Sequence, residues 1–462
     1  MNDFSPISTA GYLFIICMGI LLLKLPRRHA LIPLFLSGCY MTLGQALLIG
    51  PLHFSIFRIM LVFGWIRLLW KNELAHIKLN YIDKALMAWT AASSLIYVLN
   101  RGMSAGSIIY QLGEAYDAIV LYFLLRALIV GMDDITRAVR MLEVVIVPLA
   151  VLFVVEYTTG KNMFSVFGGV PQVTGMRGGA LRCQGPFRHP ILAGTFAATA
   201  MPLFVGLWGY NHKRLLLTAG AVAATAAIVF CSSSSGPIIA YMTGMLGLFL
   251  WVFRSKIKII LWGLLLMIIA LQMTMSAPVW HVLGSMSDLI GMGTGWYRSR
   301  LIDAAVEHFN EWWLMGTTFT ANWMPAPPGL GFNPSLINAD NADITNQFIA
   351  EGIRGGLLSL LLFIWLIIKC FKTTGTAVND KTNFLISERF IIWTIGCALL
   401  THIASFISVT YFDQIIIFWY MLIAMIAALA NSAAPVKTGR VYCLPYYVQQ
   451  SSSQTLKTGI ST

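Results

Sequence analysis

The chain has 462 residues, of which 58% are hydrophobic and only 11% are charged, and its formal net charge is +12. A spanning helix needs about 20 apolar residues, so the sequence predicts an all-α polytopic membrane protein with about 12–13 transmembrane helices. The basic residues are dispersed in short loops between apolar runs, which membrane topology explains better than nucleic-acid binding does. We therefore expect a lipid bilayer and no nucleic acid as partners.

Apolar runs of spanning length extend almost throughout the chain. The first ten residues lack the basic segment of a cleavable leader, so the first run is expected to stay as a helix. The predicted spans lie near residues 8–24, 30–50, 54–70, 84–99, 108–130, 141–158, 190–210, 213–231, 235–253, 257–277, 346–368, 387–409 and 412–431.

Lysine and arginine residues concentrate in every second loop, which places those loops in the cytoplasm and the N-terminus outside. Two long segments, 159–189 and 278–345, then lie outside. The predicted organisation is N-terminal transmembrane helices (1–139), a membrane region with both outer loops (140–431) and a tail (432–462). The tail is rich in Ser and Thr and is expected to be disordered and cytoplasmic.

The larger outer loop contains a segment, residues 296–313, with helical periodicity. Acidic and amide side chains lie away from its apolar stripe, so the segment predicts an amphipathic helix against the outer membrane surface or the bundle. The stripe consists of Leu301, Ile302, Ala305, Phe309 and Trp312.

The other outer loop carries Arg177, Arg182 and Arg188 on the side where the positive-inside rule disfavours them. Gly185 begins a Gly-Pro turn, and Pro190 suits the first turn of the next helix. The amides at that helix start would share one space with the guanidinium groups, which suits a phosphate or diphosphate. In the alternative interpretation the arginines reach lipid headgroups instead.

Three segments, taken in order, resemble the motifs of the O-antigen ligase and O-antigen polymerase superfamily over roughly residues 140–430. They are Arg182-x-x-Gly185-x-Phe187-x-x-Pro190, then Arg298 with Ala304-Ala-Val306 and Trp313-Leu-Met-Gly316, and then Asp343-Ile-Thr-Asn346 running into Glu351-Gly352. Two positions depart from the family pattern. Asp340 and Asp343 stand where relatives often carry a histidine, and Ser232-Ser-Ser-Ser235-Gly236 stands where many have Ser-Arg-Gly.

The resemblance implies a glycosyltransferase that inverts the anomeric centre and needs no metal or other cofactor. The implied donor is a glycan linked to polyprenyl (undecaprenyl) diphosphate, and the acceptor is a glycan or a lipid. Such enzymes work at the outer face of the bacterial inner membrane, beside other polysaccharide-assembly proteins, in O-antigen, capsule or exopolysaccharide synthesis. The remaining alternatives are a flippase for the same lipid-linked sugars and a non-catalytic component of an export complex.

Carried onto this sequence, the resemblance assigns catalysis to Arg182, Arg298 and Asp343. The arginines would stabilise the departing diphosphate, and Asp343 would accept the proton of the attacking hydroxyl. Asp343 could equally be the N-cap of the following span. The residues expected to contact substrate are Arg177, Arg188, Arg300, Asp340, Asn346 and Arg354.

A few other polar residues fall in or beside predicted spans. Glu114 and Asp117 are expected to pair with Arg58 or Arg101 rather than to line an acceptor entrance. Glu351 and Arg354 have the spacing of a helical ion pair. The seven cysteines show no metal-ligand spacing, although Cys183 and Cys231 fall on the same predicted side, where a disulfide is conceivable.

Overall fold

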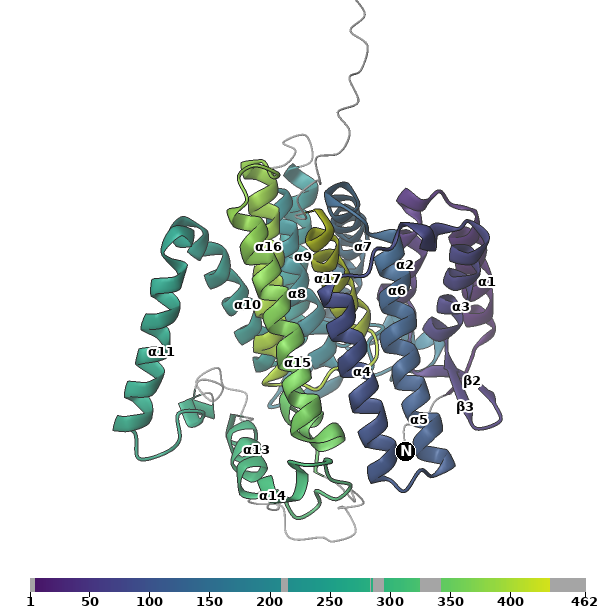
Figure 1. Ribbon diagram of the computed structural model, residues 1–462. Helices are drawn as coiled ribbons and strands as arrows, with labels where there is room; N and C mark the ends of the chain where they lie inside the picture. Colours follow the sequence, from purple (N-terminus) through teal and green to yellow (C-terminus); the bar gives the residue numbers. More distant parts are fainter. Residues whose placement is uncertain (1–4, 209–214, 283, 286–294, 325–341, 433–462) are drawn as a thin grey trace, which may run out of the picture.

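The structure is a computed structural model, and it describes residues 5–208, 215–282, 284–285, 295–324 and 342–432. Helices dominate this part of the chain (Figure 1). The α-helices are α1 (Thr9–Lys24), α2 (Leu31–Tyr40), α3 (Ile56–Trp70), α4 (Tyr81–Asn100), α5 (Ala105–Ala115), α6 (Leu121–Leu128), α7 (Met132–Thr159), α8 (Pro190–Leu207), α9 (Leu215–Cys231), α10 (Ser235–Phe249), α11 (Ile257–Thr274), α13 (Gly295–Glu307), α14 (Phe309–Trp312), α15 (Gln347–Asn379), α16 (Ile386–Phe406) and α17 (Ile415–Ser432). The 3-10 segments are η1 (Arg27–His29), η2 (Glu73–His76), η4 (Met163–Phe167) and η6 (Leu250–Lys256), and the π-helical turn η3 (Tyr116–Val120) joins α5 to α6.

Within the described residues, seven helical segments are long and apolar enough to cross a membrane, judged by length and composition. They are Tyr81–Asn100, Ala105–Leu128, Met132–Thr159, Pro190–Leu207, Ser235–Thr274, Gln347–Asn379 and Ile386–Phe406. Shorter apolar helices accompany them, among them α1, α9 and α17. The predicted class, a helical polytopic membrane protein, is confirmed at this level.

Helix α8 is almost wholly buried and packs against α9, α10 and α16. Its small side chains, among them Ala193, Gly194, Ala197 and Ala198, let these neighbours approach closely. A Cβ added to Gly194 would lie 2.5 Å from Ser232 Oγ, so a larger residue would clash there. The start of α8 is thereby fixed beside the turn that follows α9.

Helix α11 stands apart from the other helices and is joined to α10 through η6 (Figure 1). None of its residues is buried within the described chain. A helix that is apolar on all sides and unburied in protein suits contact with hydrocarbon chains.

The predicted span at 30–50 is wrong in its second half. Helix α2 ends at Tyr40, and the chain then forms a sheet of β1 (Ser5–Pro6), β2 (Gln45–Ile49) and β3 (Leu52–Ser55), in which β2 pairs parallel with β1 and antiparallel with β3. The φ of 59° at Gly50 closes the hairpin between β2 and β3, a conformation that glycine adopts readily. A short apolar run cannot be assigned to helix or strand by periodicity alone, which explains the error.

Helix α15 breaks at Gly355 and Gly356, where Gly356 has a φ of 65°. A Cβ on Gly356 would lie 2.4 Å from Leu314 O, so the break packs directly onto the segment after α14. Leu357 N donates to Trp313 O across this contact at 2.7 Å. The break therefore attaches α14 to α15.

The predicted amphipathic helix corresponds to α13 and α14, which lie beside the first part of α15 (Figure 1). Leu301, Ala305 and Trp312 of its apolar stripe are buried, whereas Phe309 is exposed. The buried side of the two helices faces protein, so the prediction is confirmed for packing against the bundle. The Pro-rich segment 325–329 and the tail after 432 lie outside the described residues.

Candidate functional site

The loop of residues 182–190, here called the motif loop, is held by α7 and by the segment after it. Near the end of α7, one carboxylate oxygen of Glu156 accepts the N–H of Gln184 at 3.1 Å and the other accepts the N–H of Gly185 at 2.9 Å. Asn162 Nδ2 donates to the carbonyl of Gly185 at 2.8 Å. These bonds satisfy the backbone of a loop that has no regular secondary structure of its own.

The sequence of the motif loop follows from its shape. Gly185 has a φ of 55°, and a Cβ there would lie 2.6 Å from the ring of Phe153, so the position needs glycine. Phe187 is fully buried, with its ring centroid 5.5 Å from that of Phe196. Pro190 occupies the first turn of α8, where its missing N–H costs nothing. Glycine, phenylalanine and proline therefore set the path that presents the arginines.

Arg182 and Arg298, which lie far apart in the sequence, converge on the turn Ser232–Ser235, here called the serine turn. Arg182 Nη2 donates to Ser234 Oγ at 3.1 Å, and Arg298 Nη1 donates to Ser235 Oγ at 3.2 Å. The serine turn opens α10, so two guanidinium groups and a helix N-terminus meet there. This combination suits an oxyanion such as a phosphate.

Further positive charge surrounds this point. Arg177 ends β4 (Gly175–Arg177), which pairs antiparallel with β5 (Ala180–Arg182). Burial, and then the charge of Arg177, lowers the pKa of Arg182. We call Arg177, Arg182 and Arg298 the arginine cluster. Arg188, also in the motif loop, lies next to Asp413 instead.

His189 caps α8, because its Nδ1 accepts the N–H of Ile191 at 3.2 Å. Burial, followed by the charges of Arg182 and Arg177, lowers the pKa of His189 to about 4. The ring is therefore neutral at pH 7. The hydrogen bond to Ile191 gives the ring a structural role at the start of α8.

Asp343 lies in the segment that leads into α15, beside α13. The hydroxyl of Tyr297, the residue before Arg298, donates to the backbone carbonyl of Asp343 at 2.8 Å. Partial burial raises the pKa of the Asp343 carboxyl, although the residue keeps an exposed surface. Asn346, not Asp343, is the N-cap of α15, and its Oδ1 accepts the N–H of Phe348 at 2.9 Å. The alternative in which Asp343 is the cap is wrong, and the Oδ1 of Asn346, predicted to contact substrate, has a structural role.

Asp413, which the sequence analysis overlooked, lies against the motif loop. It precedes α17 with a φ of 62°, its carboxyl accepts the backbone N–H of Arg188, and its Oδ2 is buried without a hydrogen-bond partner. Burial raises the pKa of Asp413 to about 7, although Arg188 opposes the shift. The adjacent Gln414 donates to the carbonyl of Pro186 at 2.8 Å. The feature of the sequence that could have identified Asp413 is an acidic residue directly before a strongly apolar helix.

The remaining predicted substrate residues have partners elsewhere. Arg300 lies 3.1 Å from Glu307 and 3.7 Å from Asp303, within α13. Arg354 lies 3.7 Å from Glu114, in a cavity between α4, α5, α15 and α17. Asp340 lies outside the described residues.

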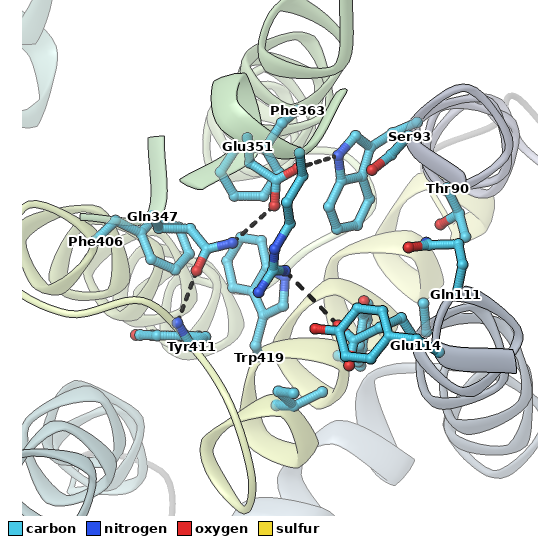
Figure 2. A pocket seen from close by; sticks show the side chains of 16 residues that line it. Thr90, Ser93, Gln111, Glu114, Gln347, Glu351, Phe363, Phe406, Tyr411 and Trp419 are labelled. Carbon is cyan, nitrogen blue, oxygen red and sulfur yellow. Dashed lines mark hydrogen bonds and ion pairs between the residues drawn. The ribbon is translucent and has the colours of Figure 1, made fainter. Parts of the chain in front are cut away.

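Two acids, Glu114 and Glu351, line that cavity (Figure 2), whereas Asp117 is not among its lining residues. Asp117 pairs with Arg58 at 2.6 Å, as expected, whereas Glu114 pairs with Arg354. Glu351 does not make the predicted ion pair with Arg354. Its carboxylate accepts hydrogen bonds from Trp89, Gln347 and Ser359 instead, and the helix unwinds directly after Arg354.

Cys183 and Cys231 lie side by side as free thiols. Cys183 N donates to Cys231 O at 2.9 Å, so the motif loop is also bonded to the end of α9. The conceivable disulfide is therefore not formed in this structure, although its two partners are neighbours.

Comparison with known proteins gives no further assignment. No protein-family model matches the chain, and no curated protein matches it.

Proposed function

We propose that this protein is a membrane glycosyltransferase that transfers glycan from a polyprenyl diphosphate carrier to an acceptor hydroxyl. In this proposal the arginine cluster binds the diphosphate at the outer face of a bacterial inner membrane. The supporting observation is the convergence of Arg182 and Arg298 on the serine turn. The two arginines belong to separate sequence segments, each of which resembles a motif of the same superfamily.

The proposed reaction requires few groups. The acceptor oxygen attacks the anomeric carbon, the bond from that carbon to the diphosphate oxygen breaks, and the diphosphate leaves with the electron pair. The arginines neutralise the charge on the leaving group. The carboxylate of Asp343 takes the acceptor's proton, and the raised pKa of this carboxyl suits a general base.

One observation favours the rival carrier function. Helix α15 is broken at Gly355–Gly356 beside charged residues, and broken helices of this kind line the substrate sites of transporters. A carrier would move the lipid-linked glycan across the bilayer without cleaving it. The two functions therefore differ in whether free polyprenyl diphosphate is released.

The deciding experiment uses the purified full chain in liposomes with bacterial polyprenyl-diphosphate oligosaccharide as donor and acceptor. We expect release of polyprenyl diphosphate together with longer or transferred glycan. Arg182→Ala and Arg298→Ala should each lower this rate by about a hundredfold or more, because each removes one charge-assisted contact to the leaving group. Arg254→Ala is the matched control, because Arg254 lies on η6 and contacts Trp251. Translocation without diphosphate release, or unchanged rates in both cluster variants, would contradict the proposal.

A further inference from the structure

The cavity between α4, α5, α15 and α17 is a second polar site, distinct from the arginine cluster. Its volume is about 80 Å³. That is room for roughly five to eight water molecules, or for the edge of one small polar ring. Both irregular helices, the break of α15 and the turn η3 after α5, lie at its wall or next to it. Such irregularities occur often at functional sites.

The inner wall of the cavity is rigidly organised. Glu351 accepts Trp89 Nε1 at 3.0 Å and Gln347 Nε2 at 2.7 Å, while Gln347 Oε1 accepts the N–H of Tyr411 at 2.7 Å (Figure 2). Each planar group is thus fixed in orientation by its neighbours. A fixed set of planar polar groups can present its remaining donors and acceptors to a ligand without losing much conformational entropy.

One polar group at this wall has no protein partner. Thr90 is only 8% exposed, it lines the cavity, and its hydroxyl makes no hydrogen bond with the described residues. A buried hydroxyl without a partner costs free energy unless a bound molecule satisfies it. Because it lines the cavity, the hydroxyl of Thr90 is free to bond a polar occupant there.

The charged groups that line the cavity determine which kinds of ligand it can bind. Glu114 pairs with the single cation, Arg354, and the carboxyl of Glu351 lines the same wall, so the cavity offers no excess positive charge to an anionic diphosphate. The guanidinium beside the acids likewise disfavours a metal cation. The wall is otherwise rich in aromatic rings, which stack on apolar ring faces. The rings belong to Trp89, Tyr110, Phe363, Phe406, Tyr411, Trp419 and Tyr420.

We propose that this cavity binds the edge of one neutral sugar ring, the terminal residue of the glycan acceptor. Aromatic walls take the apolar face of the ring, and Thr90, Gln111 and Glu114 take its hydroxyls. The entrance is the side where Tyr110, Glu114 and Arg354 are partly exposed. The assignment to an acceptor rests on the proposed transferase function, whereas the binding of a sugar does not.

The position of the cavity suits the acceptor rather than the donor. Gln347 and Tyr411 line it, and each lies a few residues from a group of the arginine site, Asp343 and Asp413 respectively. None of the residues that line the cavity belongs to the arginine cluster. A sugar joined directly to the diphosphate would lie at the cluster, so a ring in the cavity belongs to the second substrate.

The test measures sugar binding by saturation-transfer NMR with the purified full chain in detergent. The probes are the methyl glycosides of glucose, galactose, mannose and N-acetylglucosamine at millimolar concentrations. Thr90→Val keeps the shape of the side chain and removes only the unpartnered hydroxyl. Thr195→Val is the control, because Thr195 on α8 also has a buried, unpartnered hydroxyl but does not line the cavity. We expect at least one glycoside to bind the parent and the control, and about tenfold weaker binding to Thr90→Val.

Absence of binding by all four glycosides, or equal binding to the two valine variants, would overturn the sugar site. The same protein preparations are then assayed for transfer. Sugar binding that depends on Thr90, in a chain that releases no diphosphate, would uphold the cavity as a sugar site and refute the transferase. If the Thr90→Val variant transfers glycan with the same acceptor KM as the parent, only the assignment of the cavity to the acceptor is refuted.

Discussion

Glu156 on α7 and Gly185 in the motif loop are joined by a hydrogen bond of 2.9 Å from the glycine N–H to one carboxylate oxygen. The other oxygen accepts Gln184 N and the hydroxyl of Thr174, each at 3.1 Å. An acid that makes no contact with the guanidinium groups thus fixes the loop that carries them. Glu156 is a positioning residue for Arg182.

Glu156→Gln should destabilise the protein and weaken transfer. An amide keeps one acceptor oxygen but turns an NH₂ group toward a backbone N–H, so one buried donor loses its partner, at a cost of about 1–3 kcal/mol. Thermal unfolding in detergent should show a Tm several degrees lower than that of Glu307→Gln, whose side chain is half exposed on α13. Equal Tm values for the two variants would contradict this role.

Asp343→Asn should abolish transfer while leaving the fold intact. Asn346 already caps α15, so the cap is untouched, and a neutral amide cannot accept the proton. The expected loss of rate is about a hundredfold or more, measured at saturating donor. Asn346→Asp is the companion variant, because Asp and Asn cap about equally well, and it should keep both Tm and rate. A near-normal rate in Asp343→Asn would move the search for the base to Asp413.

Asp413 should make the folded state less stable as the pH rises from about 4 to about 7. Its pKa is raised to about 7 in the folded chain, so between the unfolded and folded pKa values the folded state holds a proton that the unfolded state has lost. The stabilisation is complete below the pKa that Asp413 has in the unfolded state. It is lost as the pH rises through the pKa of the folded state. His189 acts in the opposite sense, because its lowered pKa destabilises the folded state as the pH falls below 6.5.

The contribution of Asp413 to stability is therefore measured as the difference in Tm between the parent and a variant that cannot titrate at this position. The Tm of the parent minus that of Asp413→Asn, followed from pH 4 to pH 8, should fall across this window. Asn tolerates the φ of 62° at this position as well as Asp does, so the backbone is matched. A difference that stays constant with pH would show that the carboxyl titrates normally.

Cys183 and Cys231 should form a disulfide under mild oxidation, because they are adjacent and their backbones are bonded at 2.9 Å. Alkylation followed by peptide mass spectrometry should find this pair linked, while Cys39 and Cys397, buried singly in the bundle, stay alkylatable after unfolding. Recovery of both Cys183 and Cys231 as alkylated thiols after oxidant treatment would show that their geometry forbids the bond.

The topology prediction can be checked at two exposed positions. Met176→Cys lies in the hairpin that carries Arg177, and Asn379→Cys lies at the end of α15. An impermeant maleimide applied to intact cells should label the first variant and spare the second, relative to the parent chain. The reverse pattern would place the arginine cluster on the cytoplasmic side.

Most helices could be predicted from the sequence because apolar length is a local signal. Arg182 and Arg298 were identifiable from their motifs, but their common contact with the serine turn depends on how α10 and α13 pack. The strand at Gln45–Ile49 could not be predicted, since a short apolar run has no distinguishing period. Asp413 was missed because its importance arises from Arg188 in a distant loop.

The partner of Arg354 illustrates the same limit. The spacing to Glu351 is local and visible in the sequence, whereas the contact with Glu114 comes from another helix. Trp89 and Ser359 donate hydrogen bonds to Glu351, for which the sequence predicted Arg354 as the partner. Local spacing identifies candidates for pairing, and tertiary packing decides between them.

Helix α11 has no buried residue, so no neighbouring side chain in the described structure constrains its sequence. Exchange of one large aliphatic residue for another along Ile257–Thr274 should therefore be nearly neutral, since each retains the same affinity for hydrocarbon. A single charged residue near its middle would instead oppose insertion into the bilayer. Total hydrophobicity and length, rather than the shape of any one side chain, would then be what this helix requires of its sequence.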